Sequence, residues 1–141
     1  MCFPVAGWPL DCPPEDAAGA DGVYYHMLKS WPPHATKDLR TSHESKNKAI
    51  ITRNPCQACG LSVYPDPELV RDNYARLVES NPALRGNWKH VAMMTLTTAF
   101  GKVKETDGGT PRHHTWWPCD GLSRESALQH YGSLEEAEGA E

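Results

Sequence analysis

The sequence predicts an α+β fold in which a small, antiparallel, strongly bent sheet packs against one main helix over residues 67–80. Apolar residues recur at helical spacing in that segment. Short runs rich in β-branched and aromatic residues lie before and after it, without the strand–helix alternation of a parallel sheet. The 12 Pro and 11 Gly among 141 residues indicate a loop-rich chain. We expect an irregular N-terminal arm over 1–21, a single α+β domain over 22–132 and an acidic, frayed tail over 133–141.

Two strands are predicted before the helix. Residues 22–29 contain Val, two Tyr, His and Met, and this run stops before a Trp-Pro-Pro sequence that cannot continue a strand. Residues 36–47 are polar and have room for one helical turn, and 48–52 are either a short strand or the end of that helix. Residues 61–64 alternate between apolar and polar side chains, which is typical of a second strand.

The main helix has clear start and stop signals. Asp66 is suited to accept backbone N–H groups as the N-cap, and Pro67 follows at a position where its missing N–H costs nothing. Asn81 and Pro82 end the helix, because the residue before a proline avoids the helical conformation. One face carries an apolar stripe with the spacing of a buried side, made of Val70, Tyr74, Leu77 and Val78.

After the helix, residues 88–104 predict a long strand in which Gly101 marks a bend or bulge. Residues 107–109, Asp-Gly-Gly, are a turn signal, and 112–117 return as the second strand of a hairpin. Residues 124–131 are predicted to be a short helix, because Ser123 can cap its start and Gly132 can end it.

Composition excludes several classes of protein. The net charge is −4 and no run of five basic residues occurs, which argues against nucleic acid as a partner. No apolar stretch reaches the roughly 20 residues of a membrane span. Five cysteines are an odd number for a disulfide framework, which favours a reducing, cytoplasmic location. We therefore expect the partner to be a small molecule or another protein, and oligomeric state stays open.

The Cys56-Gln57-Ala58-Cys59 segment has the spacing with which two thiolates bind one zinc ion. A structural zinc site needs two more ligands, and Cys119 is the candidate for the third. The fourth would be one imidazole from a group of four: His90, His113, His114 and His130. The sequence thus predicts structural zinc at Cys56, Cys59 and Cys119. The alternative interpretation is that these are ordinary buried or loop cysteines.

The strand over 113–117 carries the best candidate site. It contains two imidazoles, a hydroxyl and two indoles, which are costly to bury without partners. We therefore expect it to line a cleft, with His113, His114 and Thr115 as catalytic residues, since histidine is the usual acid or base near neutral pH. The alternative is an edge strand whose His side chains point to water while the Trp side chains fill the core.

The opposite wall of this cleft is expected to come from the loop after the first strand, through Arg40, Ser42 and Glu44. Ligand contacts are expected from Tyr25, Trp116 and Trp117. These residues predict a small transferase or hydrolase with a His/Trp-lined cleft. The alternative is a non-catalytic module that binds a ligand or a protein without turnover.

Two further patterns carry a resemblance to known enzymes. His34-x-Thr36 and His113-x-Thr115 are similar to the paired H-x-T motifs of two-histidine phosphoesterases, which implies one His as acid and one as base. An opening strand, a Ser-bearing loop and a Gly-Leu-Ser strand resemble ADP-ribosyltransferase-like folds at the level of fold alone.

The most extended resemblance covers about residues 23–120. The segments 25–30, 38–42, 60–64 (GLSVY), 82–84 and 113–117 (HHTWW) resemble a group of small bacterial proteins of uncharacterised function. This resemblance implies a compact single-domain bacterial protein, and it implies no particular chemistry.

Overall fold

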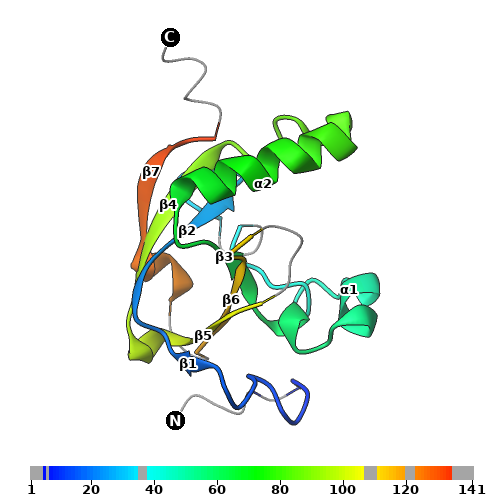
Figure 1. Cartoon of the computed structure of the whole chain (residues 1–141), viewed down its shortest axis with the longest axis vertical. Helices are drawn as coiled ribbons and strands as arrows, with labels where there is room; N and C mark the ends of the chain where they lie inside the picture. Colours follow the sequence, from blue (N-terminus) through cyan, green and yellow to red (C-terminus); the bar gives the residue numbers. More distant parts are fainter. Residues whose placement is uncertain (1–4, 6, 35–37, 107–110, 120–122, 135–141) are drawn as a thin grey trace.

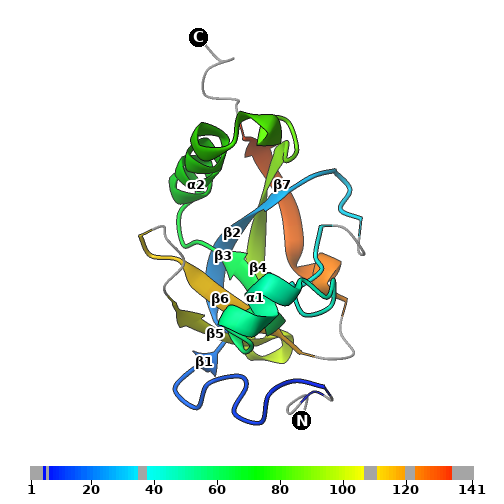
Figure 2. The ribbon, with the colours of Figure 1, turned by 90° about the vertical axis from the view of Figure 1, so that its right-hand side faces the viewer.

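The chain forms two antiparallel sheets and one long helix in the computed structural model, which describes residues 5, 7–34, 38–106, 111–119 and 123–134 (Figures 1 and 2). The first sheet has the order β1 (Ala18–Gly19), β5 (Gly101–Glu105), β6 (His114–Pro118), β3 (Leu61–Val63). The second has the order β2 (Gly22–Leu28), β4 (His90–Leu96), β7 (Leu128–Ser133). The α+β class and the main helix are confirmed, but two sheets replace the single bent sheet that the sequence predicted.

The division into two sheets occurs inside the predicted strand 88–104. That segment contains β4, the 3₁₀ turn η3 (Thr98–Phe100) and β5, so the chain leaves one sheet and enters the other. Gly101 has φ of +124°, a conformation that side chains rarely allow, and it begins β5 opposite Pro118. One backbone bridge, Tyr25 to Tyr64, connects the two sheets.

Helix α2 (Pro67–Ser80) has the predicted bounds and cap. The Asp66 carboxylate accepts the N–H of Glu68 at 2.9 Å, and Pro67 occupies the first turn. The helix lies across the second sheet (Figure 1) and buries Val70, Tyr74 and Val78 against Tyr64, Val91 and Leu134, among others. Leu77 is only half-buried at the edge of this stripe.

The N-terminal arm is part of the folded body. β1 pairs with β5, and Cys12, which is 3% exposed, forms a disulfide with Cys56 across 44 residues of sequence. The sequence predicted an irregular arm, and among the described residues the two-residue strand β1 is regular structure within it. The predicted turn over 107–109 and the tail from residue 135 onward lie outside them.

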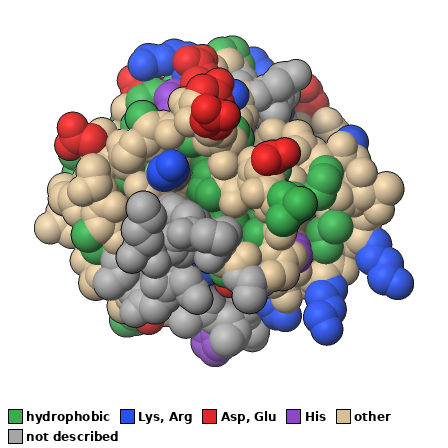
Figure 3. All heavy atoms as spheres, turned by 90° about the horizontal axis from the view of Figure 1, so that it is seen from below, with side chains coloured by type: hydrophobic (Ala, Val, Ile, Leu, Met, Phe, Trp, Pro, Cys, Tyr) green, Lys and Arg blue, Asp and Glu red, His purple; other side chains and the backbone are tan. Residues whose placement is uncertain are grey.

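Two short segments differ from or refine the expectation. Residues 48–52, left open between strand and helix, belong to helix α1 (Lys48–Arg53), whose N-cap Asn47 accepts the N–H of Ile50. This helix buries none of its residues, and apolar and basic side chains gather on its side of the molecule (Figure 3). The predicted helix 124–131 is wrong: a 3₁₀ turn, η4 (Arg124–Ala127), is followed by β7, which pairs with β4.

The core lies mainly between the sheets. Its largest cluster combines Met94 and Leu96 of β4 with Leu61, Val63 and Trp116 of the first sheet. None of the described helices is long and apolar enough to cross a membrane.

Candidate functional site

His113 and Thr115 belong to a buried hydrogen-bond network. His113 is 3% exposed, and its ring nitrogens contact the hydroxyls of Ser62 at 2.8 Å and Thr106 at 3.0 Å. The Thr115 hydroxyl is 2.7 Å from that of Thr106. The ring of Tyr64 packs edge-on against His113. The cost of burying these polar groups is therefore offset by hydrogen-bond partners on β3 and at Thr106, the residue after β5. Their hydrogen bonds are made within the protein, without an open cleft.

The two indoles of β6 are core residues. Trp116 and Trp117 are at most 1% exposed. Their N–H groups donate to the carbonyl oxygens of Phe100 at 2.9 Å and Cys56 at 2.8 Å. Neither ring has exposed surface for a ligand. Both lie in the core, as the alternative interpretation of this strand predicted for the Trp side chains. Trp116 and Trp117 are therefore corrected from ligand contacts to packing residues.

His114 and Tyr25, the other predicted site residues of the two sheets, are half-buried and lie apart. The Nδ1 atom of His114 is 2.7 Å from the Arg112 carbonyl, and its ring packs on Tyr24. The ring of Tyr25 instead packs edge-on against Tyr131. Tyr25 contacts the α2 side of the second sheet, whereas Tyr24 contacts the core between the sheets.

Arg40, Ser42 and Glu44 stand in a loop that is held by its own network. Glu44 accepts the N–H of Thr41 at 2.9 Å while its own N–H donates to the Thr41 hydroxyl, a reciprocal capping arrangement. Arg124 donates to both Glu44 carboxylate oxygens at 2.7 Å. Burial acts to raise the pKa of Glu44, but the hydrogen bonds from Arg124 and Thr41 outweigh it and lower the pKa. Arg40 is exposed and Ser42 half-buried.

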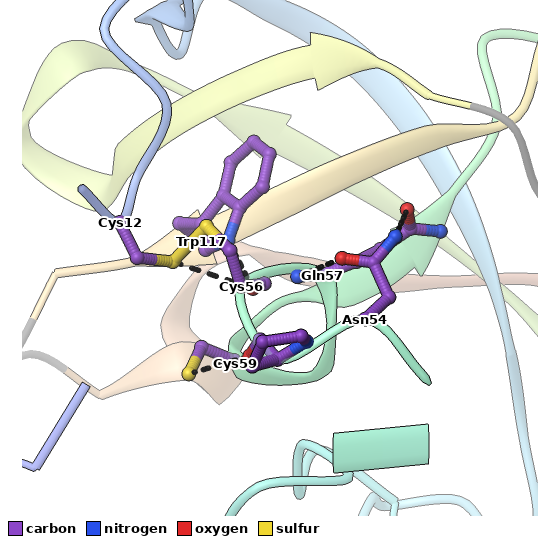
Figure 4. The surroundings of a disulfide bond; sticks show 7 residues. Cys12, Asn54, Cys56, Gln57, Cys59 and Trp117 are labelled. Atoms are coloured by element: carbon purple, nitrogen blue, oxygen red, sulfur yellow. Dashed lines mark hydrogen bonds between the residues drawn. A yellow bond between two sulfur atoms is a disulfide. The ribbon is translucent and has the colours of Figure 1, made fainter. Parts of the chain in front are cut away.

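The cysteines do not assemble the predicted zinc site. Cys56 is paired with Cys12 (Figure 4). Cys119 is also disulfide-bonded. A disulfide sulfur is not a thiolate and does not serve as a zinc ligand in the way that the spacing implied. Among the described residues, no group of three or more His, Cys, Asp or Glu side chains lies close enough to hold a metal ion. Cys59 stays a free, buried thiol.

A different group of side chains stands out at the surface of the second sheet. Nδ1 of His90 on β4 lies 3.0 Å from Nε2 of His130 on β7, and the two rings meet edge-on. The Trp31 ring packs on His130 with centroids 5.2 Å apart. His130 is exposed and Trp31 is 38% exposed. We call Trp31, His90 and His130 the imidazole–indole cluster.

The loop that carries Trp31 is held in place by Asp38. The buried Asp38 carboxylate accepts hydrogen bonds from the backbone of Lys29 and Ser30, from the Ser30 hydroxyl at 2.8 Å and from the His34 N–H at 2.8 Å. Burial acts to raise the pKa of Asp38, but these donors outweigh it and keep the pKa low. The carboxylate is thus charged at neutral pH and anchors both ends of the loop.

The environment of His90 keeps its imidazole neutral near physiological pH. Partial burial lowers the pKa of His90, and the charge of protonated His130 lowers it further. The nearby Asp38 carboxylate acts in the opposite direction, and Lys89 adds to the lowering. A neutral imidazole presents a nitrogen lone pair, so His90 is in the form that binds hydrogen-bond donors or metal ions.

The sequence could not reveal this cluster directly. His90 and His130 were considered only as partners for cysteines, and His130 was expected on a helix. The two histidines are 40 residues apart, and only the pairing of β4 with β7 makes them neighbours. A weak signal was present only for His90, which follows Trp88-Lys89 at the start of a predicted strand.

His26 predicts how stability depends on pH. Burial lowers the pKa of His26, although the carbonyls of Ser62 and Asp38 at its two ring nitrogens oppose the shift. The unfolded chain, with an ordinary pKa near 6.5, then binds more protons than the folded chain just below that pH. We expect the free energy of unfolding to be maintained above about pH 6.5 and to fall as pH drops from there toward the folded pKa.

Urea denaturation at several pH values between about 7.5 and 5.5 measures this slope. In His26→Gln the slope should decrease, and the part that remains reports His90, whose pKa is lowered too. An unchanged slope in His26→Gln would contradict the assignment.

Of the two H-x-T motifs, the second contains the buried His113 and Thr115, and Thr36 of the first lies outside the described residues. The resemblance to two-histidine phosphoesterases, to ADP-ribosyltransferase-like folds and to the small bacterial group stays a prediction. Comparison of the chain with protein-family models, with curated proteins and with solved structures finds no match.

Proposed function

We propose that the chain is a binding module that holds a divalent transition-metal ion between His90 and His130. The observation that carries this proposal is the 3.0 Å separation of two imidazole nitrogens on adjacent strands, at a surface that a ligand can reach. Imidazole nitrogen is a preferred ligand of zinc, copper and nickel ions.

The separation of the two nitrogens fits one edge of a coordination sphere. Metal–nitrogen bonds of about 2.0–2.1 Å at angles between 90° and 109° put the two nitrogens roughly 2.8–3.4 Å apart. The observed 3.0 Å lies inside that interval. Binding replaces one ring-to-ring hydrogen bond by two bonds to the ion. It requires the proton of His90 on Nε2 and that of His130 on Nδ1.

The surroundings support an ion with two protein ligands. Trp31 packs on His130 and limits the movement of that ring, while Asp38 holds the loop that carries Trp31. The lowered pKa of His90 favours the unprotonated ring that a metal requires. Water or a further ligand completes the coordination, which leaves the ion accessible to a partner molecule.

The disulfide suggests where such a module works. Disulfides such as Cys12–Cys56 persist in oxidising compartments and are rare in the cytoplasm. We therefore place the chain in an oxidising compartment, in contrast to the cytoplasmic location that its odd cysteine count favoured. The transferase or hydrolase hypothesis depends on His113, His114 and Thr115, with Arg40, Ser42 and Glu44 opposite. It stays a prediction, and of these residues His113, Thr115 and Glu44 are held in the networks described above.

Calorimetric titration with Cu²⁺ or Zn²⁺ at pH 7.5 tests the proposal, and we expect one ion per chain. Loss of an outer partner of a metal ligand commonly costs 10–100-fold in affinity, so His90→Ala and His130→Ala should each weaken binding by more than about tenfold. Affinity should also fall as the pH is lowered, because protons compete with the ion for ligand nitrogens.

His114→Ala is the matched control, since it removes a half-buried imidazole from the other sheet. Cu²⁺ should also quench the fluorescence of Trp31, and Trp31→Phe should remove that part of the quenching. Equal affinity of the wild type, His90→Ala and His130→Ala would exclude the site.

A further inference from the structure

Cys56 has two cysteines as potential partners, and the disulfide uses only one of them. It is bonded to Cys12 of the N-terminal arm, while Cys59 stands three residues further along the same 3₁₀ turn, η1 (Gln57–Cys59). The Cys59 N–H donates to the Cys56 carbonyl at 3.0 Å. Side chains three residues apart in such a turn lie one above the other. Figure 4 shows both side chains leaving the turn toward the same side of the view.

The turn itself is held firmly, so the two cysteines keep this relation. Asn54 and Gln57 bond through their side chains at 2.9 Å, and the Asn54 side chain also accepts the Gln57 N–H. Trp117 donates its indole N–H to the Cys56 carbonyl at 2.8 Å. Cys12, Cys59 and Trp117 belong to one buried apolar cluster, and Cys56 packs against it, so the three cysteine side chains lie in the same region of the core.

We propose that this cluster is a disulfide switch in which Cys56 exchanges Cys12 for Cys59, which removes the cross-link between Cys12 and the turn. The Cys59 thiolate attacks Sγ of Cys56 and the Cys56–Cys59 bond forms. The Cys12–Cys56 bond breaks, and Cys12 leaves as a thiolate that takes up a proton. One disulfide is lost and one is formed, so the step needs no oxidant or reductant. It is independent of the proposed metal site.

In the folded structure the exchange of disulfides is suppressed. Cys59 is fully buried, and burial together with the negative charge of Glu44 raises the pKa of its thiol to about 11. On the order of one Cys59 in 10,000 is then a thiolate at pH 7, and only the thiolate attacks a disulfide. Glu44 is the charged group that acts on this thiol. It is tied to the turn because His43, its neighbour, donates its backbone N–H to the Ala58 carbonyl.

Differential alkylation tests the switch in the whole protein, without added thiol. The protein is incubated between pH 7 and 9.5, quenched in acid, unfolded and alkylated, and then digested with trypsin. Before digestion the remaining disulfides are reduced, and the thiols that they release are alkylated with a second reagent of different mass. Cleavage after Lys29 and Arg53 then places Cys12 on one peptide and Cys56 and Cys59 on another. Fragmentation in the mass spectrometer then locates the alkylated cysteine.

We expect the alkyl group on Cys59 at first, with transfer to Cys12 at a rate that rises about tenfold per pH unit, as the thiolate fraction does. Glu44→Gln should accelerate the transfer, and Cys59→Ser should abolish it. The proposal is overturned if the label stays on Cys59 throughout, including in about 2 M urea, which loosens the cluster. Release of Cys12 at the same rate in Cys59→Ser overturns it too, because the attacking thiol would then be another one.

Discussion

Replacing Cys12 and Cys56 together by alanine should lower the free energy of unfolding by about 4 kcal/mol. The disulfide closes a loop of 44 residues, and the entropy that it removes from an unfolded chain of that loop length corresponds to about this value at 25 °C. The effect is large for this fold because the bond joins the N-terminal arm to the turn at Cys56, whose carbonyl accepts the indole N–H of Trp117. Urea denaturation of the oxidised wild type and of the double variant measures the difference.

Cys59→Ala is the matched control for this experiment. It removes a buried sulfur from the same cluster but leaves the cross-link in place. We expect it to cost on the order of 1 kcal/mol, the amount for a small buried group. The double variant should also lose the dependence of stability on reducing agent that this bond causes. A double variant within about 1 kcal/mol of the wild type would show that the disulfide contributes little to stability.

Gly101→Ala should be the most disruptive single substitution of a glycine, with a loss of roughly 3–5 kcal/mol. Gly101 has φ of +124°, where a side chain is strained by about 1–3 kcal/mol. A Cβ would also lie 2.1 Å from the Trp117 carbonyl oxygen and 2.9 Å from the Cys119 nitrogen. Both are backbone atoms, one in β6 and one in the residue after it, and they cannot rotate away, so the two chain segments must separate. Overpacking of this kind adds about 1–3 kcal/mol.

Gly86→Ala separates the two parts of that loss. Gly86 has φ of +86°, so alanine is strained there as well, but its Cβ would have no neighbour within 4 Å. We expect a loss of about 1 kcal/mol, in line with the cost of the left-handed conformation alone. Thermal or urea denaturation of both variants gives the comparison. If both variants lose the same free energy of unfolding, the close approach of β5 to the Trp117 carbonyl is not the reason that residue 101 must be glycine.

Local sequence signals were sufficient where an element is stabilised by its own residues. Asp66, Pro67 and the stripe from Val70 to Val78 predict α2 with its observed bounds, because capping and helical spacing act within one segment. The strands around Tyr25 and Thr115 were predicted for the same reason, from β-branched and aromatic side chains. The prediction of the cleft residues was less successful, because the same His and Trp side chains are equally suited to a buried hydrogen-bond network and to an open site.

The α+β class, the main helix and most strands thus follow from the sequence alone, because periodicity and capping are properties of neighbouring residues. Tertiary structure decided the rest. Leu128–Ser133 became a strand because the edge of β4 offered its backbone a partner, and that pairing alone brings His130 to His90. The arm gave Cys56 the partner Cys12 in place of a zinc ion. Such choices depend on contacts between residues some 40 positions apart, and no local pattern in the chain records them.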